Sequence, residues 1–331
     1  MLLSAIFSIF LSLSKVLFFP LLVIRVYIGL SSIRVIYCWL RLELNILRIL
    51  PLIVLSDSFS SAATGLKYFL IQAWGSRVFL FRVLVGLGGG RLMLAARVSL
   101  ALKLGAAPFH LWFIRVLRKT GYEVLVLLST IQKILPLYLL SLIPRIRVKI
   151  WLSGIRALVG AWGVYRSRGL AVILGFSSVF LRSWLLAGSF VRVESWVIYL
   201  ALYRAGLVGM VSILQRYRVV TISQLQGGVI KGEQEWEFYV FLFFLAGLPP
   251  FPTFWAKLNI LRGLLGSRIG GLVGVLLVGS VWVIYLYVRV GLFIITLNHA
   301  WRLRSRFTLQ SGYTSVIVLL SLRLSVWIIL L

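Results

Sequence analysis

The chain has 331 residues, of which 61% are hydrophobic and 13% charged, and its mean hydropathy is +1.04. Soluble proteins average about 45–50% apolar and about 25% charged residues, so this composition excludes a water-soluble globular fold and predicts a polytopic membrane protein. The 35 Lys and Arg exceed the 7 Asp and Glu by a net charge of +28, but they are scattered between apolar runs, which argues against nucleic acid as a partner.

Apolar runs of membrane-crossing length recur along the whole chain. The first 19 residues lack a basic start and a small-residue cleavage site, which favours a first span over a signal peptide. Short connections predict antiparallel neighbours in an all-α transmembrane bundle, one membrane domain over 1–331, with polar loops at 216–236 and 299–312. The roughly eleven expected spans are 3–28, 32–55, 66–88, 91–113, 123–143, 148–167, 170–190, 193–215, 236–257, 267–296 and 314–331.

Two features suggest cofactor chemistry, and each has a simpler interpretation. The glycine-rich segment 86–90 lacks the strand, helix and acidic residue of a dinucleotide-binding unit, so we expect a turn between two apolar runs. The single cysteine, Cys38, excludes an internal disulfide and cannot by itself hold an iron–sulfur cluster, which needs several thiolates. We therefore expect no cofactor in this chain.

Four ionisable side chains fall well inside apolar runs, where a charge costs several kcal/mol and normally faces a polar interior with a partner. Glu43 lies in an otherwise apolar helix and is one of only 7 acids. Its simplest alternative role is an ion pair with Arg41 or Arg48 near a helix end. Lys133 is central in its span, so its ammonium cannot easily reach the membrane surface.

The other two, Lys103 and Lys257, each accompany a predicted helix break, at 105–108 and 247–252. Irregular backbone at membrane depth is tolerated only where protein buries it or where it lines a wet cavity. A lysine can release its proton in such a place, whereas an arginine cannot. His110 lies close enough along the first segment to continue a proton path, although a lone histidine is as often structural. Two interrupted segments with lysines predict a transport pathway, and the alternative for the second is a proline-rich loop with an interfacial lysine.

The motifs around these residues resemble those of subunit 2 of mitochondrial NADH:ubiquinone oxidoreductase, a family of antiporter-like membrane subunits of respiratory complex I. The resemblance follows most of the chain in order. It rests on WLRLELNILRILP (39–51), KYFLIQA (67–73), KLGAAPFHLW (103–112), QKILP (132–136) and GLPPF (247–251), which are similar to the family's WxGLExNxLxxIP, KYFLxQA, KLGxAPFHxW, QKLAP and GLPPF.

The resemblance implies an antiporter-like bundle of about eleven spans with two broken helices, translocating protons in the mitochondrial inner membrane. It implies that Glu43 and Lys103 form a buried pair, that Lys133 is the central relay, and that Lys257 passes protons onward. His110 would lie on the hydrated axis of the bundle. Redox chemistry in other subunits would drive the relay.

Departures from the family pattern limit what the resemblance implies, beginning with Arg41, which stands where glycine is usual. Ile114 and Arg115 replace the usual Pro-Glu, and Leu181 stands where a histidine is usual, so that histidine's relay role does not carry over. Arg182 is expected to pair with another subunit or a lipid. The expected partners are other membrane-arm subunits in a hetero-oligomer and anionic lipid such as cardiolipin. A free-standing cation/proton antiporter and a structural subunit with inert charges remain the alternative functions.

Overall fold

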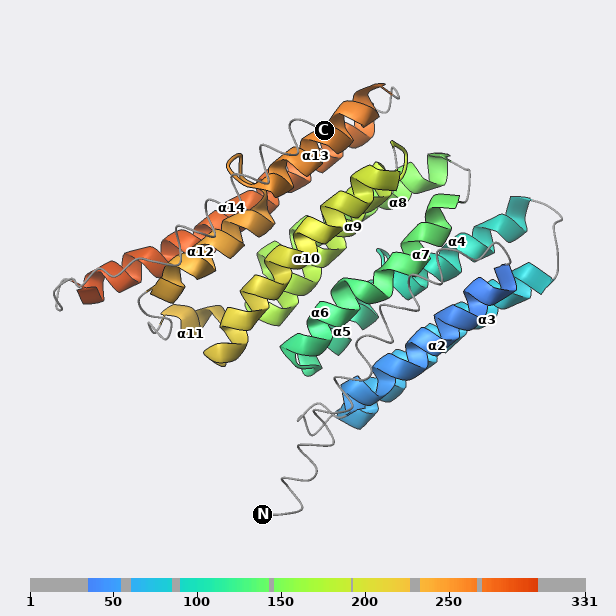
Figure 1. Ribbon diagram of the computed structural model, residues 1–331, viewed down its shortest axis with the longest axis horizontal. Coiled ribbons are helices and arrows are strands. Elements are labelled where there is room, and N and C mark those ends of the chain that lie inside the picture. Colours follow the sequence, from blue (N-terminus) through green and yellow to red (C-terminus); the bar gives the residue numbers. More distant parts are fainter. Residues whose placement is uncertain are drawn as a thin grey trace, which may run out of the picture. The chain divides into compact units, whose positions relative to one another are not determined.

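The computed structural model describes residues 35–54, 61–84, 90–142, 146–191, 193–226, 233–266 and 270–302. These residues are helical apart from their connections and one isolated bridge between Gly169 and Thr221 (Figure 1). The chain divides into two compact units, 1–144 and 145–331. The helices are α2 (Val35–Val54), α3 (Ser61–Leu84), α4 (Gly90–Leu104), α5 (Leu111–Lys119), α6 (Tyr122–Ser129), α7 (Ile131–Leu142), α8 (Ile146–Arg166), α9 (Leu170–Gly188), α10 (Val193–Arg216), α11 (Ile222–Gln226), α12 (Glu233–Ala246), α13 (Pro252–Gly266) and α14 (Gly270–Arg302).

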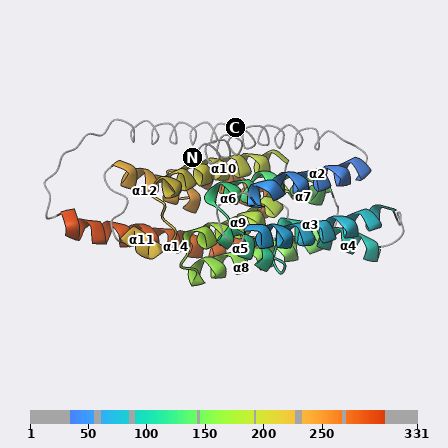
Figure 2. The ribbon, with the colours of Figure 1, turned by 90° about the horizontal axis from the view of Figure 1, so that it is seen from below.

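The helices of the first unit form two layers (Figure 2). One layer contains α2, α6 and α7, and the other contains α3, α4 and α5; α2 packs on α3, and α4 packs on α7. Ile46, Leu100, Leu125 and Leu140 are buried within this unit. In a membrane such packing is stabilised by van der Waals contact and polar bonds rather than by removing apolar surface from water.

In the second unit, α9 is buried nearly all round, as expected of a helix that is apolar on every side. It packs closely against α8 because glycines on α8 leave room for its side chains and backbone. A Cβ on Gly160 would lie 2.6 Å from the backbone nitrogen of Phe180, and a Cβ on Gly163 would overlap the Phe176 ring. Small residues allow such close approach between membrane helices.

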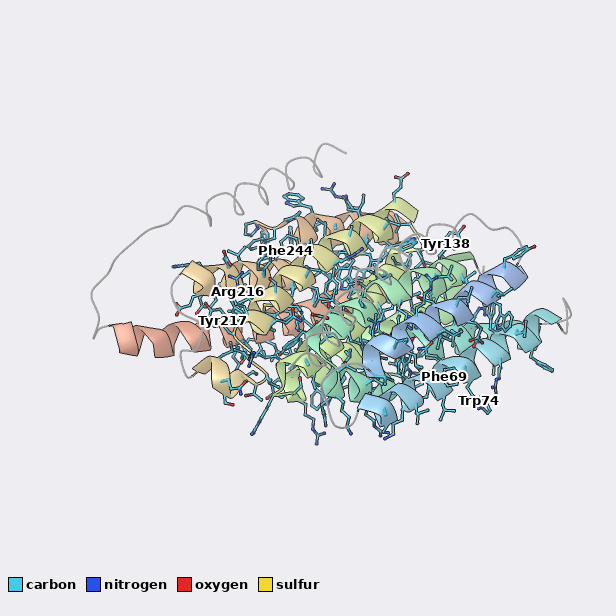
Figure 3. The ribbon with its side chains drawn as sticks, turned by 60° about the horizontal axis from the view of Figure 1, so that its bottom comes forward. Phe69, Trp74, Tyr138, Arg216, Tyr217 and Phe244 are labelled. Atoms are coloured by element: carbon cyan, nitrogen blue, oxygen red, sulfur yellow. The ribbon has the colours of Figure 1, made fainter. Side chains whose placement is uncertain are left out.

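Within the described residues, 4 segments are long and apolar enough to cross a membrane. Large apolar side chains also lie on the outside of helices beyond these segments; Trp74 on α3, labelled in Figure 3, is 67% exposed. Such side chains suit contact with lipid. The 4 segments are Tyr122–Ser141, Leu170–Gly188, Glu194–Arg216 and Gly270–Gly291, which correspond to the predicted spans 123–143, 170–190, 193–215 and 267–296.

The structure differs from the sequence expectation mainly at helix ends. The runs 91–113 and 236–257 are each divided into two helices, at 105–110 and at 247–251. A further break, which contains neither Gly nor Pro, falls at Thr130 between α6 and α7.

Two stretches expected to be loops are partly helical. The stretch 216–236 contains α11 and the start of α12, and α14 continues into the stretch 299–312 as far as Arg302. The prediction of loops from polar composition alone was therefore wrong about where these helices begin and end. The predicted spans 3–28 and 314–331 lie outside the described residues, as does all of the glycine segment except Gly90, which begins α4.

The contact between α8 and α9 can be tested by adding a single methyl group. Gly160→Ala should destabilise the protein by about 1–3 kcal/mol because the backbone of Phe180 must move. Gly154→Ala on the same helix meets nothing within 4 Å and should stabilise it by about 0.5–1 kcal/mol. Thermal melting of the purified protein in detergent measures both, and an equal or higher melting temperature for Gly160→Ala would contradict the packing.

Candidate functional site

Lys103 lies in the last turn of α4 and is only 6% exposed. Side chains from two other helices hold this helix end. Gln72 Nε2 donates a hydrogen bond to the Lys103 carbonyl, and Trp112 Nε1 donates one to the Leu102 carbonyl, each at 3.1 Å. A helix leaves its last carbonyl groups without intrahelical donors, so these two side chains satisfy the end of α4 inside the bundle.

The side chain of Lys103 packs against α3. A Cβ on Gly75 would lie 2.9 Å from Lys103 Cγ, so the glycine makes room for the lysine stem. Among the described residues, Lys103 Nζ has no hydrogen-bond partner, but the half-buried carboxylate of Glu43 acts on it through space. Glu43 and Lys103 are therefore close enough for their charges to interact, without a direct hydrogen bond between them.

The break after α4 turns the chain back across this site. Gly105 has φ +58°, a left-handed conformation that glycine adopts without strain, and a Cβ there would lie 2.8 Å from Phe113 Cβ. The Ala107–Pro108 peptide bond is cis. His110 ends the break at the N-cap of α5, where its carbonyl accepts a hydrogen bond from the Ile114 nitrogen at 3.2 Å and its imidazole is half-buried.

Lys133 is 4% exposed and lies in the first turn of α7, directly after the break at Thr130. Its ammonium nitrogen lies 3.9 Å from the centroid of the Phe113 ring, an attractive cation–π contact. Phe113 is the same residue that packs against Gly105. The aromatic ring therefore links the break beside Lys103 with Lys133.

Lys257, in the second unit, is 7% exposed and interacts with the end of an interrupted helix. Its Nζ donates a hydrogen bond of 2.9 Å to the carbonyl of Ala246, the last residue of α12, and lies 5.8 Å from the centroid of the Trp184 ring. Thr253 Oγ1 donates to the Phe244 carbonyl at 2.6 Å. A cation is favourable at a helix C-terminus because the helix dipole is negative there.

Gly247 makes this capping arrangement possible. It has φ +76°, and a Cβ on it would lie 2.7 Å from Lys257 Nζ. A glycine in the left-handed conformation after a helix end is a common stop signal. Here the missing side chain also leaves the space that the lysine amine fills.

The five residues predicted from the sequence are thus divided between the units: Glu43, Lys103, His110 and Lys133 lie in the first and Lys257 in the second. Their chemistry is that of proton donors and acceptors. In the described ranges no three His, Cys, Asp or Glu side chains lie close enough together to hold a metal ion.

The sequence reasoning did not assign roles to Gln72, Trp112 or Thr253, although the polar side chains of Gln72 and Thr253 in apolar segments were an available signal.

Comparison with known proteins identifies relatives over most of the chain. The family model for the transmembrane region of NADH:quinone oxidoreductase and Mrp antiporters matches residues 85–284. NADH-ubiquinone oxidoreductase chain 2 of Artemia franciscana is 31% identical over 265 residues, 77% of this chain and 81% of the relative. Chain 2 of Locusta migratoria is 25% identical over 299 residues, 86% of each protein.

Solved structures share the fold at lower sequence identity. A chain of respiratory complex I from Thermus thermophilus superposes with a TM-score of 0.73 at 20% identity, covering 95% of this chain and 77% of that one. A chain of the Mrp complex from Dietzia superposes with a TM-score of 0.69 at 17% identity, covering 82% and 59%. These likenesses confirm the predicted all-α, antiporter-like fold.

The capping of α12 by Lys257 predicts that Gly247→Ala loosens this helix end. The left-handed conformation costs a non-glycine residue about 1–2 kcal/mol, and the new methyl group displaces the amine from the Ala246 carbonyl. Hydrogen exchange in a peptide from the last turn of α12 should become faster. Gly266→Ala, which meets nothing within 4 Å, is the control and should leave that exchange unchanged. Unchanged exchange in Gly247→Ala would contradict the assigned role of the glycine.

Proposed function

This chain belongs to the NADH:quinone oxidoreductase/Mrp antiporter family, and from that premise we propose that it translocates protons in the membrane arm of respiratory complex I. It is a multi-pass membrane subunit of NADH:ubiquinone oxidoreductase. The match over residues 85–284 includes Lys103, Lys133 and Lys257, the three buried lysines on which the proposal depends.

The proposed relay begins at the pair formed by Glu43 and Lys103. A proton crosses hydrocarbon only along polar groups and water, and an ionisable group there is costly unless a partner or a wet interior compensates it. An opposite charge nearby favours the charged form of an acid or base. The burial of Lys103 beside the opposite charge of Glu43, without a hydrogen bond that would lock the two groups together, carries the proposal, because such a pair can open and close.

Breaking or remaking this pair then changes the proton affinity of Lys133 and, further on, of Lys257. The shared contact of Phe113 with Gly105 and Lys133 supports coupling between the first two steps. His110, at the start of α5, is proposed to lie beside this path. The two compact units act as one antiporter-like domain of about eleven spans in this proposal.

The energy for translocation comes from redox chemistry in other subunits of the complex, and this chain contributes no redox centre. We place it in the mitochondrial inner membrane among other membrane-arm subunits, because its motifs resemble the mitochondrial subunit 2 family. Its net charge of +28 supports contact with anionic lipid such as cardiolipin at the membrane surfaces.

Lys133→Met tests the central relay. It keeps the length of the side chain but removes the titrating amine, so proton transfer through this chain should slow roughly 100-fold or more. The measurement is the ratio of protons pumped to NADH oxidised by the complex reconstituted in vesicles. Lys67→Met, at an exposed position on α3, is the control and should leave the ratio unchanged. A wild-type ratio of protons pumped to NADH oxidised in Lys133→Met would refute the relay role. In a separate experiment, proton transport by vesicles that contain this chain alone would instead indicate a free-standing antiporter.

A double-mutant cycle tests the pair of Glu43 and Lys103. Glu43→Gln and Lys103→Met should each lower thermal stability and proton pumping, because each leaves the other group without its opposite charge. The double variant should recover stability, with a coupling energy of about 0.5–3 kcal/mol, but not pumping. Glu194→Gln, at an exposed position, should change neither property. Normal pumping in the double variant would favour a structural subunit whose charges are inert.

A further inference from the structure

Four exposed arginines lie at one end of the second unit, where two connections between helices meet. Arg166 ends α8, and Arg168 follows it in the connection to α9. Arg216, labelled in Figure 3, ends α10, and Arg218 follows it in the connection to α11. We call these four residues the arginine patch. Arg182, which the sequence led us to expect beside a lipid or another subunit, has an exposed fraction of 0% and does not belong to the patch.

Backbone hydrogen bonds join the two connections that carry the arginine patch. The Leu170 nitrogen donates to the Val220 carbonyl at 3.0 Å, and the Ile222 nitrogen donates to the Arg168 carbonyl at 3.3 Å. These two bonds flank the isolated bridge between the connections. The four arginines are therefore attached to one joined piece of backbone rather than to two independent loops.

Arg218 occupies a backbone position that suits glycine. Its φ is +51°, in the left-handed region. The Arg218 nitrogen donates to the Gln215 carbonyl and the Val219 nitrogen to the Leu214 carbonyl, each at 3.1 Å, which is the pattern of a helix end that usually carries glycine. Left-handed backbone is unfavourable for every other residue type, and such strain is concentrated where a side chain has a function. The strained arginine therefore indicates that its side chain is used.

Exposed side chains along α8 indicate that the patch lies at the level of lipid headgroups. The exposed apolar Leu158 is followed by the exposed rings of Trp162 and Tyr165, and then by the first arginine of the patch. The centroid of the Tyr165 ring lies 6.0 Å from that of Trp162 and 5.7 Å from that of Trp282 on α14. Trp and Tyr are enriched at the boundary between hydrocarbon and headgroups, so the arginines that follow them face headgroups.

The exposed charge at this end of the unit is positive. The helix α12 begins at the same end, because it packs antiparallel to α10. Of the acids there whose side chains the structure describes, Glu235 is buried and Glu237 is half-buried, whereas all four arginines of the patch are exposed. Arginine suits phosphate in particular, because its planar fork can donate two parallel hydrogen bonds to phosphate oxygens.

We propose that the arginine patch binds the headgroup of an anionic phospholipid that carries two phosphate groups. The arginines form two pairs, one on each connection, so each phosphate of one lipid molecule can meet a pair. A phospholipid with a single phosphate would leave one pair unmatched. The acyl chains of the lipid cover the exposed side of α8 at Leu158 and Trp162. This site gives a location to the anionic-lipid contact proposed above, on which it rests, and it uses none of the proposed proton-relay residues.

Cross-linking with photoactivatable cardiolipin tests the site in the purified complex after its bound lipid has been washed out with detergent. Mass spectrometry should find the probe on peptides from the α8–α9 and α10–α11 connections. Unlabelled cardiolipin should prevent this cross-linking at a concentration roughly 10-fold lower than phosphatidylglycerol, which has one phosphate, and pyrophosphate, which has no acyl chains, should not compete. Equal competition by cardiolipin and phosphatidylglycerol, or by cardiolipin and pyrophosphate, would overturn the proposal. So would cross-links from these connections to another subunit in place of the probe.

Arg218→Gly separates lipid binding from the stability of the helix end. Glycine suits the left-handed conformation, so without added cardiolipin the variant should melt at the same temperature as wild type or higher. Its cross-linking to cardiolipin should nevertheless weaken roughly 10-fold, as expected for the loss of a charge-assisted hydrogen bond. Arg168→Gln tests the other connection and should show the same loss. Arg77→Gln, at an exposed position on α3, also removes one positive charge and should behave like wild type.

Wild-type cross-linking in both Arg218→Gly and Arg168→Gln would overturn the proposal. Cross-links elsewhere in the chain, with none in the two connections, would also overturn it but would leave the general contact with anionic lipid standing. The measurement does not involve proton transfer, so its result is independent of the proton pumping measured for Lys133→Met.

Discussion

Inside a membrane, a helix that stops must still find hydrogen-bond donors for its last carbonyl groups, and this requirement organises the breaks that follow α4 and α12. At the end of α4 the donors are Gln72 and Trp112, and at the end of α12 they are Thr253 and Lys257. The breaks and the buried polar side chains therefore depend on each other. A break without donors would be unstable, and a buried polar side chain without the freed carbonyls would lose its partner.

The sequence was sufficient to locate the groups that carry the proposed chemistry, because a titratable residue among apolar neighbours is conspicuous without a structure. Glu43, Lys103, Lys133 and Lys257 were all found in this way, and Gly and Pro marked two breaks. The side chains that these groups contact in the folded chain could not be identified in the same way. Hydrophobic periodicity is weak in helices that are apolar on every side, so it did not indicate which helices would meet beyond the chain neighbours that short connections predict.

The break at Thr130 shows a second limit of sequence reasoning. The segment around it contains no glycine, and its only proline, Pro136, lies within α7 rather than at the break. The interruption is a property of local backbone geometry, with Thr130 at φ −117° and ψ −77°, and its hydroxyl donates to the Val126 carbonyl at 2.6 Å. A threonine that bonds to the preceding turn is known to bend helices, but it does so too irregularly to predict a break.

The space shared by Gly247 and Lys257 has an evolutionary consequence. The amine of one residue occupies the place where the other would carry its first side-chain carbon. Substitutions at the two positions are therefore coupled. A larger residue at 247 requires a shorter one at 257, and in a chain without the lysine the available space would no longer require glycine at 247. In related sequences, the residues at positions 247 and 257 are therefore expected to vary together.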